Sequence, residues 1–283
     1  MEMQGGTETE KPHFPRRERE AHKGVFGKVF LLSGSRGYTG APCLAAKAAV
    51  RSGAGLVTVG VPEDVYPIVA VKCCDEAMVW PLPEVYGELL QKAKSADAVL
   101  IGPGLGQGEK AEEYTLNLLR DITCPVILDA DGLNIISRHI DVLDKRRALT
   151  VLTPHEGEFA RLTDCQIPIR DRHTEAEAFA RKHGCILVLK GHWTITALPD
   201  GHCYINRTGN PGMARGGSGD ALAGLMVGLL GQRLWDPVRA VISAVWLHGR
   251  AGDLAAAEKG EYGMAVSDMI EMIPCAIKEC EEE

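Results

Sequence analysis

Residues 210–220 read Asn210-Pro211-Gly212-Met213-Ala214-Arg215-Gly216-Gly217-Ser218-Gly219-Asp220, and a run of small and apolar residues over 221–230 follows them. The glycines remove the Cβ atoms from a turn that opens a helix, so backbone N–H groups there can converge on an anion. The helix dipole adds partial positive charge at the same point. The pattern predicts a phosphate-binding turn, with Gly217, Ser218 and Gly219 as its anion hole.

Asp220 stands in the first turn of the predicted helix, beside the expected anion. A carboxylate in that position can accept the proton of an attacking hydroxyl during phosphoryl transfer. The alternative is a plain glycine-rich loop in which Asp220 only complements the helix dipole. One short motif does not decide between the two readings, so the other segments of the chain must.

The composition indicates one large α/β domain. The chain has 283 residues, 45% of them hydrophobic, which is enough to bury a sizeable core. We expect a single domain over residues 21–283. Residues 1–20 mix charged residues and prolines with few apolar positions, which predicts a flexible tail or a loosely packed leading helix.

Charge and cysteine usage narrow the class of protein. The net charge of −7 and the pI near 5.8 argue against a nucleic-acid partner. Nine scattered cysteines form no CxxC pair and no spacing that suggests a disulfide framework or a zinc site. No apolar run is long enough to span a bilayer, and the first twenty residues lack the apolar core of a signal peptide. We therefore expect a cytoplasmic protein with free thiols and no membrane partner.

Six apolar runs read as buried strands and end in glycine or polar residues: 28–32, 55–62, 98–101, 125–128, 149–152 and 185–189. Residues 42–52 read as a helix, the segment between the second and third strands as helical, 193–205 as a hairpin, and 236–280 as helices. Continuous apolar strands alternating with helices predict a mainly parallel sheet covered by helices on both faces. Ligands of such sheets bind at the carboxyl ends of the strands.

Several polar residues stand at those predicted strand ends. His155 either caps the next helix or faces a ligand, and we favour the ligand. Lys190 ends an apolar strand, where a cation is better placed facing a phosphate than facing the core. Asp129, Asp131 and Asn134 either hold Mg²⁺ or cap the following helix, and capping is favoured for Asp131.

Taken together, these loops resemble the ribokinase-like superfamily and, within it, the ADP/ATP-dependent NAD(P)H-hydrate dehydratases. The resemblance covers about residues 28–254. It rests on six motifs: Tyr38-Thr39-Gly40-Ala41, Gly102-Pro103-Gly104-Leu105-Gly106, Leu128-Asp129-Ala130-Asp131-Gly132-Leu133-Asn134, Thr153-Pro154-His155-Glu156-Gly157-Glu158, Lys190-Gly191-His192-Trp193-Thr194 and Asn210-Pro211-Gly212-Met213.

The resemblance implies a reaction on damaged cofactors. The C6 hydroxyl of hydrated NADH or NADPH, (S)-NADHX or (S)-NADPHX, attacks the terminal phosphoryl group of a nucleotide. The phosphorylated hydrate then eliminates phosphate and regenerates NADH or NADPH. Asp220 is the expected base, and a divalent metal, Mg²⁺, shares the phosphate charge through ligands that stay unknown.

The same resemblance implies where each substrate lies. Ala41, Gly106, His155 and Asp220 are expected to contact the hydrate. Lys190, Gly191, His192, Trp193, Thr194 and Gly219 are expected to contact the nucleotide. Ala41 and Gly106 can equally be structural, because small residues permit close approach of helices and strands.

Two other functions stay open at this stage. One is a kinase of the same superfamily acting on a small alcohol, such as a thiamin precursor or a sugar. The other is a non-catalytic nucleotide-binding protein, against which the intact Gly-Gly-Ser-Gly-Asp run argues. ADP is expected as the donor, by similarity to bacterial and archaeal members, and the epimerase domain often fused to this family is expected to be missing. Small residues over 221–231 and 240–257 permit packing between subunits, as in a homo-oligomer such as a tetramer.

Overall fold

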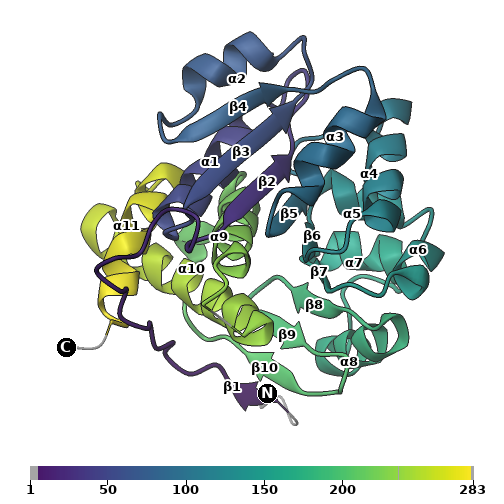
Figure 1. The fold of residues 1–283 in the computed structure, drawn as a ribbon. Helices are drawn as coiled ribbons and strands as arrows, with labels where there is room; N and C mark the ends of the chain where they lie inside the picture. The colour runs from purple at the N-terminus through teal and green to yellow at the C-terminus, as the bar shows by residue number, and fades with distance from the viewer. Residues whose placement is uncertain (1–5, 235, 282–283) are drawn as a thin grey trace.

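The computed structural model describes residues 6–234 and 236–281. Within them, a 10-stranded sheet forms the centre of the molecule (Figure 1). Its strands are β1 (Thr7–Glu8), β2 (Lys28–Leu32), β3 (Leu56–Val61), β4 (Ala77–Pro81), β5 (Ala98–Ile101), β6 (Val126–Leu128), β7 (Thr150–Leu152), β8 (Ile186–Leu189), β9 (Ile195–Ala197) and β10 (Cys203–Ile205). Their order across the sheet is β1-β10-β9-β8-β7-β6-β5-β2-β3-β4.

The helices of the described residues are α1 (Gly40–Arg51), α2 (Tyr66–Lys72), α3 (Tyr86–Lys94), α4 (Glu109–Asp121), α5 (Asp131–Ile136), α6 (Asp141–Lys145), α7 (Glu156–Thr163), α8 (Arg172–His183), α9 (Ser218–Gly231), α10 (Pro237–Lys259) and α11 (Val266–Lys278), with one 3₁₀ turn, η1 (Pro211–Met213). None of them is long and apolar enough to cross a membrane.

The strands from β4 through β8 pair in parallel, so the predicted mainly parallel sheet is confirmed. β8, β9 and β10 pair antiparallel, which confirms the hairpin over residues 193–205. The helical material expected between residues 62 and 98 is present as α2 and α3, but the chain also forms the edge strand β4 there, which the sequence did not indicate. Its apolar run ends after four residues at Pro81, too short for periodicity to separate a strand from a buried helical turn.

Alternate residues of each strand face opposite layers of helices. In β2, Val29 and Leu31 belong to the core under α1, α9, α10 and α11, whereas Phe30 and Leu32 belong to the core under α3 to α8. Side chains that alternate between two buried faces explain why these strands are apolar without interruption. The prediction of helices on both faces is confirmed (Figure 1).

Helix α9 lies inside the molecule, against the sheet and between α1 and α10 (Figure 1). All of its residues from Ala221 to Gly231 are buried. A Cβ on Gly224 would lie 2.1 Å from the backbone oxygen of Ala45 in α1, so only glycine allows this approach. The small residues over 221–231 were expected to permit packing between subunits. They pack instead against other elements of the same chain.

The described part of the N-terminal segment follows a defined path along the domain. β1 pairs in parallel with β10, and Phe14 is buried and forms a bridge with Glu281. Arg17 donates hydrogen bonds to the backbone oxygen of Gly53 and to Gln232. Residues 6–17 therefore form no leading helix, whereas the flexibility expected of residues 1–20 stays a prediction. Residues 1–5 lie outside the described residues.

We expect Gly224→Ala to lower the free energy of unfolding by about 2 kcal/mol, because the added methyl group forces α9 away from α1. Gly87→Ala is the matched control: Gly87 is an exposed residue of α3 with open space around it, and alanine favours helix there. Urea unfolding measures both. Equal stability of Gly224→Ala and the unchanged protein would refute the close-packing argument.

Candidate functional site

A cavity of about 830 Å³ opens where the carboxyl ends of β6, β7 and β8 face the N-terminus of α9. Its volume lies in the range of small-molecule sites. The polar residues at its wall come from segments far apart in the sequence, and they include Asp129, His155, residues 190–194 and residues 217–220. The convergence expected from a parallel sheet is therefore present.

A buried ion pair lies at the base of the cavity. The Nζ atom of Lys190 is 2.7 Å from Oδ1 of Asp129 and 3.6 Å from Oε2 of Glu158. The hydroxyl of Thr153 also donates to Oδ1 of Asp129, at 2.8 Å. Burial alone would lower the pKa of Lys190, but the neighbouring carboxylates outweigh it and raise that pKa. Lys190 is therefore a fixed positive charge.

Asp220 also lines this cavity, and its pKa differs from that of an ordinary aspartate. Burial raises its pKa to about 7, the negative charge of Asp129 adds to the rise, and Lys190 opposes it. A carboxylate with a pKa near neutrality can both accept and release a proton at physiological pH. Asp220 has the properties expected of a general base.

The turn that begins α9 has the form the glycines predict. Gly217 has a φ of 95°, in the left-handed region that favours glycine, and no described side chain caps the helix. The N–H of Ser218 donates to the backbone oxygen of Arg215 at 3.3 Å. The next N–H groups of the first turn are those left for another acceptor. His248 of α10 donates from Nε2 to the backbone oxygen of Ser218 at 2.9 Å. Burial lowers the pKa of His248 to about 4, so the ring stays neutral while it positions the turn.

Residues 190–194 form the opposite wall. The guanidinium of Arg172 donates to the backbone oxygens of Leu189, Lys190 and His192 and so fixes the shape of this loop. The rings of His192 and Trp193 are stacked with centroids 4.8 Å apart. The guanidinium of Arg207 lies 5.2 Å from the centre of the Trp193 ring. Flat rings and cations beside a cavity suit a nucleotide base and its phosphates.

His155 has a structural role as well as a place at the cavity wall. Its Nδ1 accepts hydrogen bonds from the backbone N–H groups of Gly157 and Glu158, and the Glu158 side chain accepts from the His155 N–H. This capping box starts α7. His155 still lines the cavity with its half-exposed ring, so the cap corrects the view of His155 as a ligand contact alone.

Ala41 and Gly106 both lie outside the lining of this cavity. A Cβ on Gly104 would meet the Cβ of Ala41 at 3.1 Å, which brings the loop after β5 against the start of α1. Oδ2 of Asp131 accepts from the N–H of Gly106 at 2.8 Å, and no side chain caps α5. The expectation that Asp131 caps its own helix is wrong: it holds the Gly106 loop beside the end of β6.

Comparison with known proteins identifies the family of this chain. The family model described as NAD(P)H-hydrate dehydratase matches residues 29–275. The chain belongs to the NAD(P)H-hydrate dehydratase family. A solved structure titled ADP/ATP-dependent NAD(P)H-hydrate dehydratase from Bacillus subtilis, co-crystallised with ATP and Mg²⁺, is 35% identical with a TM-score of 0.81, covering 95% of each chain. This likeness confirms the ribokinase-like fold that the sequence predicts.

Two curated relatives extend the comparison. The ADP-dependent (S)-NAD(P)H-hydrate dehydratase of Bacillus subtilis is 36% identical over 264 residues, which is 92% of each protein. The bifunctional NAD(P)H-hydrate repair enzyme Nnr of Moorella thermoacetica is 42% identical over 285 residues, which is 96% of this chain and 53% of the relative. The chain thus spans about half the length of the bifunctional relative.

The candidate site also contains residues that the sequence alone did not indicate. Glu158 stands inside a quoted motif, and its position one helical turn after His155 is the capping-box signal that could have found it. Arg172, Arg207 and His248 carry no comparable signal, because each reaches the site from a helix or loop far along the chain.

We expect Gly219→Val to weaken nucleotide binding at least tenfold, because a Cβ there lies 3.3 Å from Nζ of Lys190 and the branched side chain fills the space before the turn. Gly216→Val is the matched control, since Gly216 is exposed and has open space around it. Gly217→Val is less clean: its Cβ meets Leu44 at 2.6 Å, so unfolding is expected as well. Calorimetric titration with nucleotide measures binding, and equal affinity of Gly219→Val and Gly216→Val would remove the turn from the site.

Proposed function

We propose that this protein catalyses the nucleotide-dependent dehydration of (S)-NADHX and (S)-NADPHX back to NADH and NADPH. The observation that carries the proposal is the position of Asp220, a buried carboxylate with a pKa of about 7, directly beside the open N-terminus of α9. A base and an anion site in contact are what a phosphoryl transfer to a hydroxyl requires. Membership of the family supports the choice of the hydrate as the acceptor.

The proposed reaction has two steps, phosphorylation of the hydrate and elimination of phosphate. The C6 hydroxyl oxygen of the hydrate bonds to the terminal phosphorus of the nucleotide as its proton passes to Asp220. The bond from that phosphorus to the bridging oxygen breaks, which leaves AMP when ADP is the donor. The ring nitrogen of the hydrate then pushes electrons toward C6 as the C6–O bond breaks and phosphate leaves. Loss of a proton from C5 to solvent forms the C5=C6 double bond, and NADH or NADPH remains. Hydroxide is a poor leaving group and phosphate is a good one, so phosphorylation makes the elimination feasible.

The site residues divide between the two substrates in this proposal. Lys190 to Thr194 hold the nucleotide, with the stacked rings of His192 and Trp193 toward its base. The N–H groups of Gly217 to Gly219 and the charge of Lys190 stabilise the transferred phosphoryl group. Ala41, Gly106 and His155 contact the hydrate. The placement of Ala41 and Gly106 outside the cavity lining calls for a hydrate that extends from Asp220 toward the loop after β5.

The residues present also fit a Mg²⁺ ion that arrives with the nucleotide. Asp129, Glu158 and Asp220 place three carboxyl groups around one lysine, so the base of the site is acidic. Mg²⁺ in phosphoryl-transfer sites is held by substrate phosphates, waters and one or two carboxylates. When bound, the ion shares the charge of the phosphates, and Asp129 and Asp220 are the carboxylates that would hold it.

Two functions compete with this one, and the acceptor distinguishes them. A small-alcohol kinase would release a stable phosphorylated thiamin precursor or sugar and leave the hydrate unchanged. A non-catalytic binding protein would bind nucleotide without turnover. Return of NADH absorbance from hydrated NADH, with donor supplied, is the decisive observation for the dehydratase.

A cytoplasmic location and a homo-oligomeric state are part of this proposal, and the free thiols of the nine cysteines suit a reducing compartment.

We expect Asp220→Asn to lower the turnover rate about 10²-fold or more while the nucleotide still binds, because the amide keeps the shape of the side chain but cannot accept the proton. Folding raises the pKa of Asp220 to about 7, so its basic form prevails above that pH. The rate of the unchanged enzyme should therefore fall about tenfold per pH unit below pH 7. Asp75→Asn, at an exposed residue, is the matched control. A near-normal rate in Asp220→Asn would exclude Asp220 as the base.

ADP is the expected donor. Its β-phosphoryl group must reach the turn at Gly217 to Gly219 while its adenosine lies along Lys190 to Thr194. ATP bound with its adenosine in the same place carries an extra phosphoryl group into the space of the hydrate. We therefore expect a higher kcat/KM for ADP than for ATP, with AMP, phosphate and NAD(P)H as products. A preference of tenfold or more for ATP would overturn the donor assignment and leave the dehydration itself untouched.

A further inference from the structure

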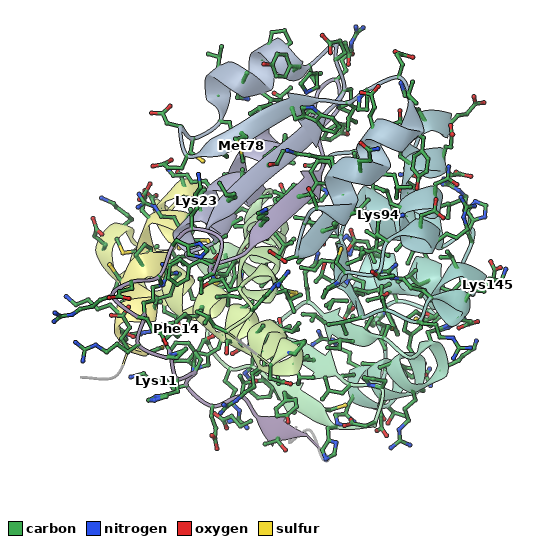
Figure 2. The ribbon with its side chains drawn as sticks, in the orientation of Figure 1. Lys11, Phe14, Lys23, Met78, Lys94 and Lys145 are labelled. Carbon is green, nitrogen blue, oxygen red and sulfur yellow. The ribbon has the colours of Figure 1, made fainter. Side chains whose placement is uncertain are left out.

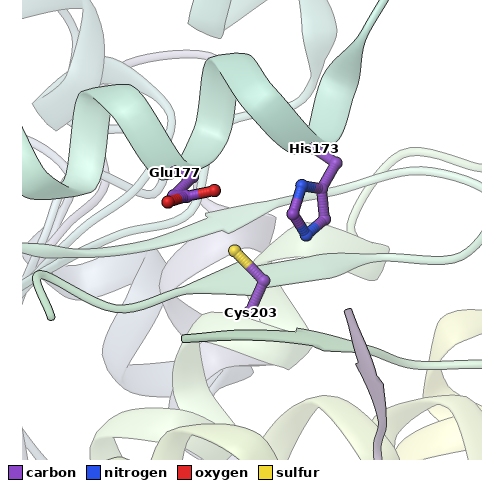
Figure 3. A group of neighbouring side chains, drawn as sticks. All are labelled: His173, Glu177 and Cys203. Carbon is purple, nitrogen blue, oxygen red and sulfur yellow. The ribbon is translucent and has the colours of Figure 1, made fainter. Parts of the chain in front are cut away.

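Three side chains with metal-binding atoms meet outside the nucleotide cavity, between α8 and β10. His173 and Glu177 lie one helical turn apart on α8, and Cys203 begins β10. One nitrogen, one carboxylate oxygen and the sulfur lie within 4.8 Å of one another. Figure 3 shows the imidazole, the carboxylate and the thiol turned into the same space.

The cluster contains an unmet hydrogen-bonding group. His173 is 9% exposed, and its Nε2 atom has no hydrogen-bond partner among the described residues. Buried polar groups in folded proteins nearly always find a partner, so one that lacks it needs an explanation. Cys203 is also buried, at 5% exposed. His173 and Cys203 thus each place a buried ligand atom in the cluster. The carboxylate of Glu177 lies beside them.

Charge at the cluster also suits a cation. Burial raises the pKa of the Cys203 thiol to about 11, and the negative charge of Glu177 raises it further, while Arg181 opposes both. The thiol is thus protonated when no metal is bound. Among the described residues, Arg181 is the cation that pairs with the cluster, at 3.1 Å from Oε1 of Glu177. A metal would displace the thiol proton to solvent and compete with Arg181.

We propose that His173, Glu177 and Cys203 bind a zinc ion. Thiolate and imidazole are ligands of zinc rather than of Mg²⁺ or Ca²⁺, which take oxygen. Tetrahedral zinc with bonds of about 2.0–2.3 Å holds its ligand atoms about 3.5 Å apart, a contraction that small side-chain rotations supply. Three protein ligands leave the fourth position to water.

The position of this zinc site gives it a structural role. His173 follows Arg172, whose guanidinium fixes the loop from Leu189 to His192. Cys203 begins the strand that leads to Arg207 at the cavity wall. Zinc would therefore join the helix that holds one wall of the nucleotide cavity to the strand that supplies another. It is independent of the proposed reaction and lies away from Asp220.

The test titrates the metal-free full chain with zinc alone, in competition with a colorimetric zinc chelator and without nucleotide. We expect one zinc per chain in the unchanged protein and a higher Tm on binding. Affinity should fall at least hundredfold in Cys203→Ser and in His173→Gln. Cys275→Ser, at an exposed cysteine of α11, is the matched control and should bind as the unchanged protein does.

Cobalt provides a second readout of the ligand set. Co²⁺ bound to a thiolate shows a sulfur-to-metal charge-transfer absorption, which we expect in the unchanged protein and not in Cys203→Ser. Should Cys203→Ser fail to fold, His173→Gln carries the test with a loss of at least hundredfold, and Glu177→Gln with a loss of at least tenfold. Zinc affinity within threefold of the unchanged protein in the folded variants overturns the proposal. So does a loss that appears in Cys275→Ser instead, or a cobalt complex without the thiolate band.

Discussion

The approach of α9 to α1 is the constraint on which the site depends. Glycines 224 and 228 let the two helices meet backbone to backbone, since a Cβ on Gly228 would lie 2.0 Å from the hydroxyl of Ser52. This contact buries residues 221–231 of α9 against the sheet and directs the N-terminus of the helix to the carboxyl ends of the parallel strands. The turn at Gly217, the side chain of Asp220 and the strand ends share one cavity because that helix lies deep in the fold.

The charge balance of the cavity follows from the same burial. Three carboxyl groups surround one lysine in a region that excludes water, so not all of them favour the ionised state. Asp129 pairs with the Lys190 ammonium and accepts the Thr153 hydroxyl. Burial raises the pKa of Asp220 to about 7. Two aspartates of one site thus have different surroundings. Figure 2 shows the side chains of the described residues on the ribbon.

Sequence patterns predicted the parts of the fold that periodicity and glycine control. The buried strands, the hairpin and the turn at Gly217 were confirmed, because each has a local signature. The edge strand β4 was missed, since a short apolar run does not specify its secondary structure. The roles of Asp131 and His155 were not resolved either: the sequence marks both as polar residues at strand ends, but only the fold shows which backbone N–H groups lie within their reach.

The sequence did not predict that Arg207 reaches the site. The reason is the pairing of the last strands of the sheet. After β8 the strand direction reverses, so β9 and β10 return antiparallel and carry Arg207 back over Trp193. A further parallel strand would have required a crossover helix at this edge, whereas the hairpin leaves it open. The cavity lies beside this hairpin, and His248 and Gly249 of α10 also line it. The change from parallel to antiparallel pairing thus makes room for a ligand beside the ion pair of Lys190 and Asp129.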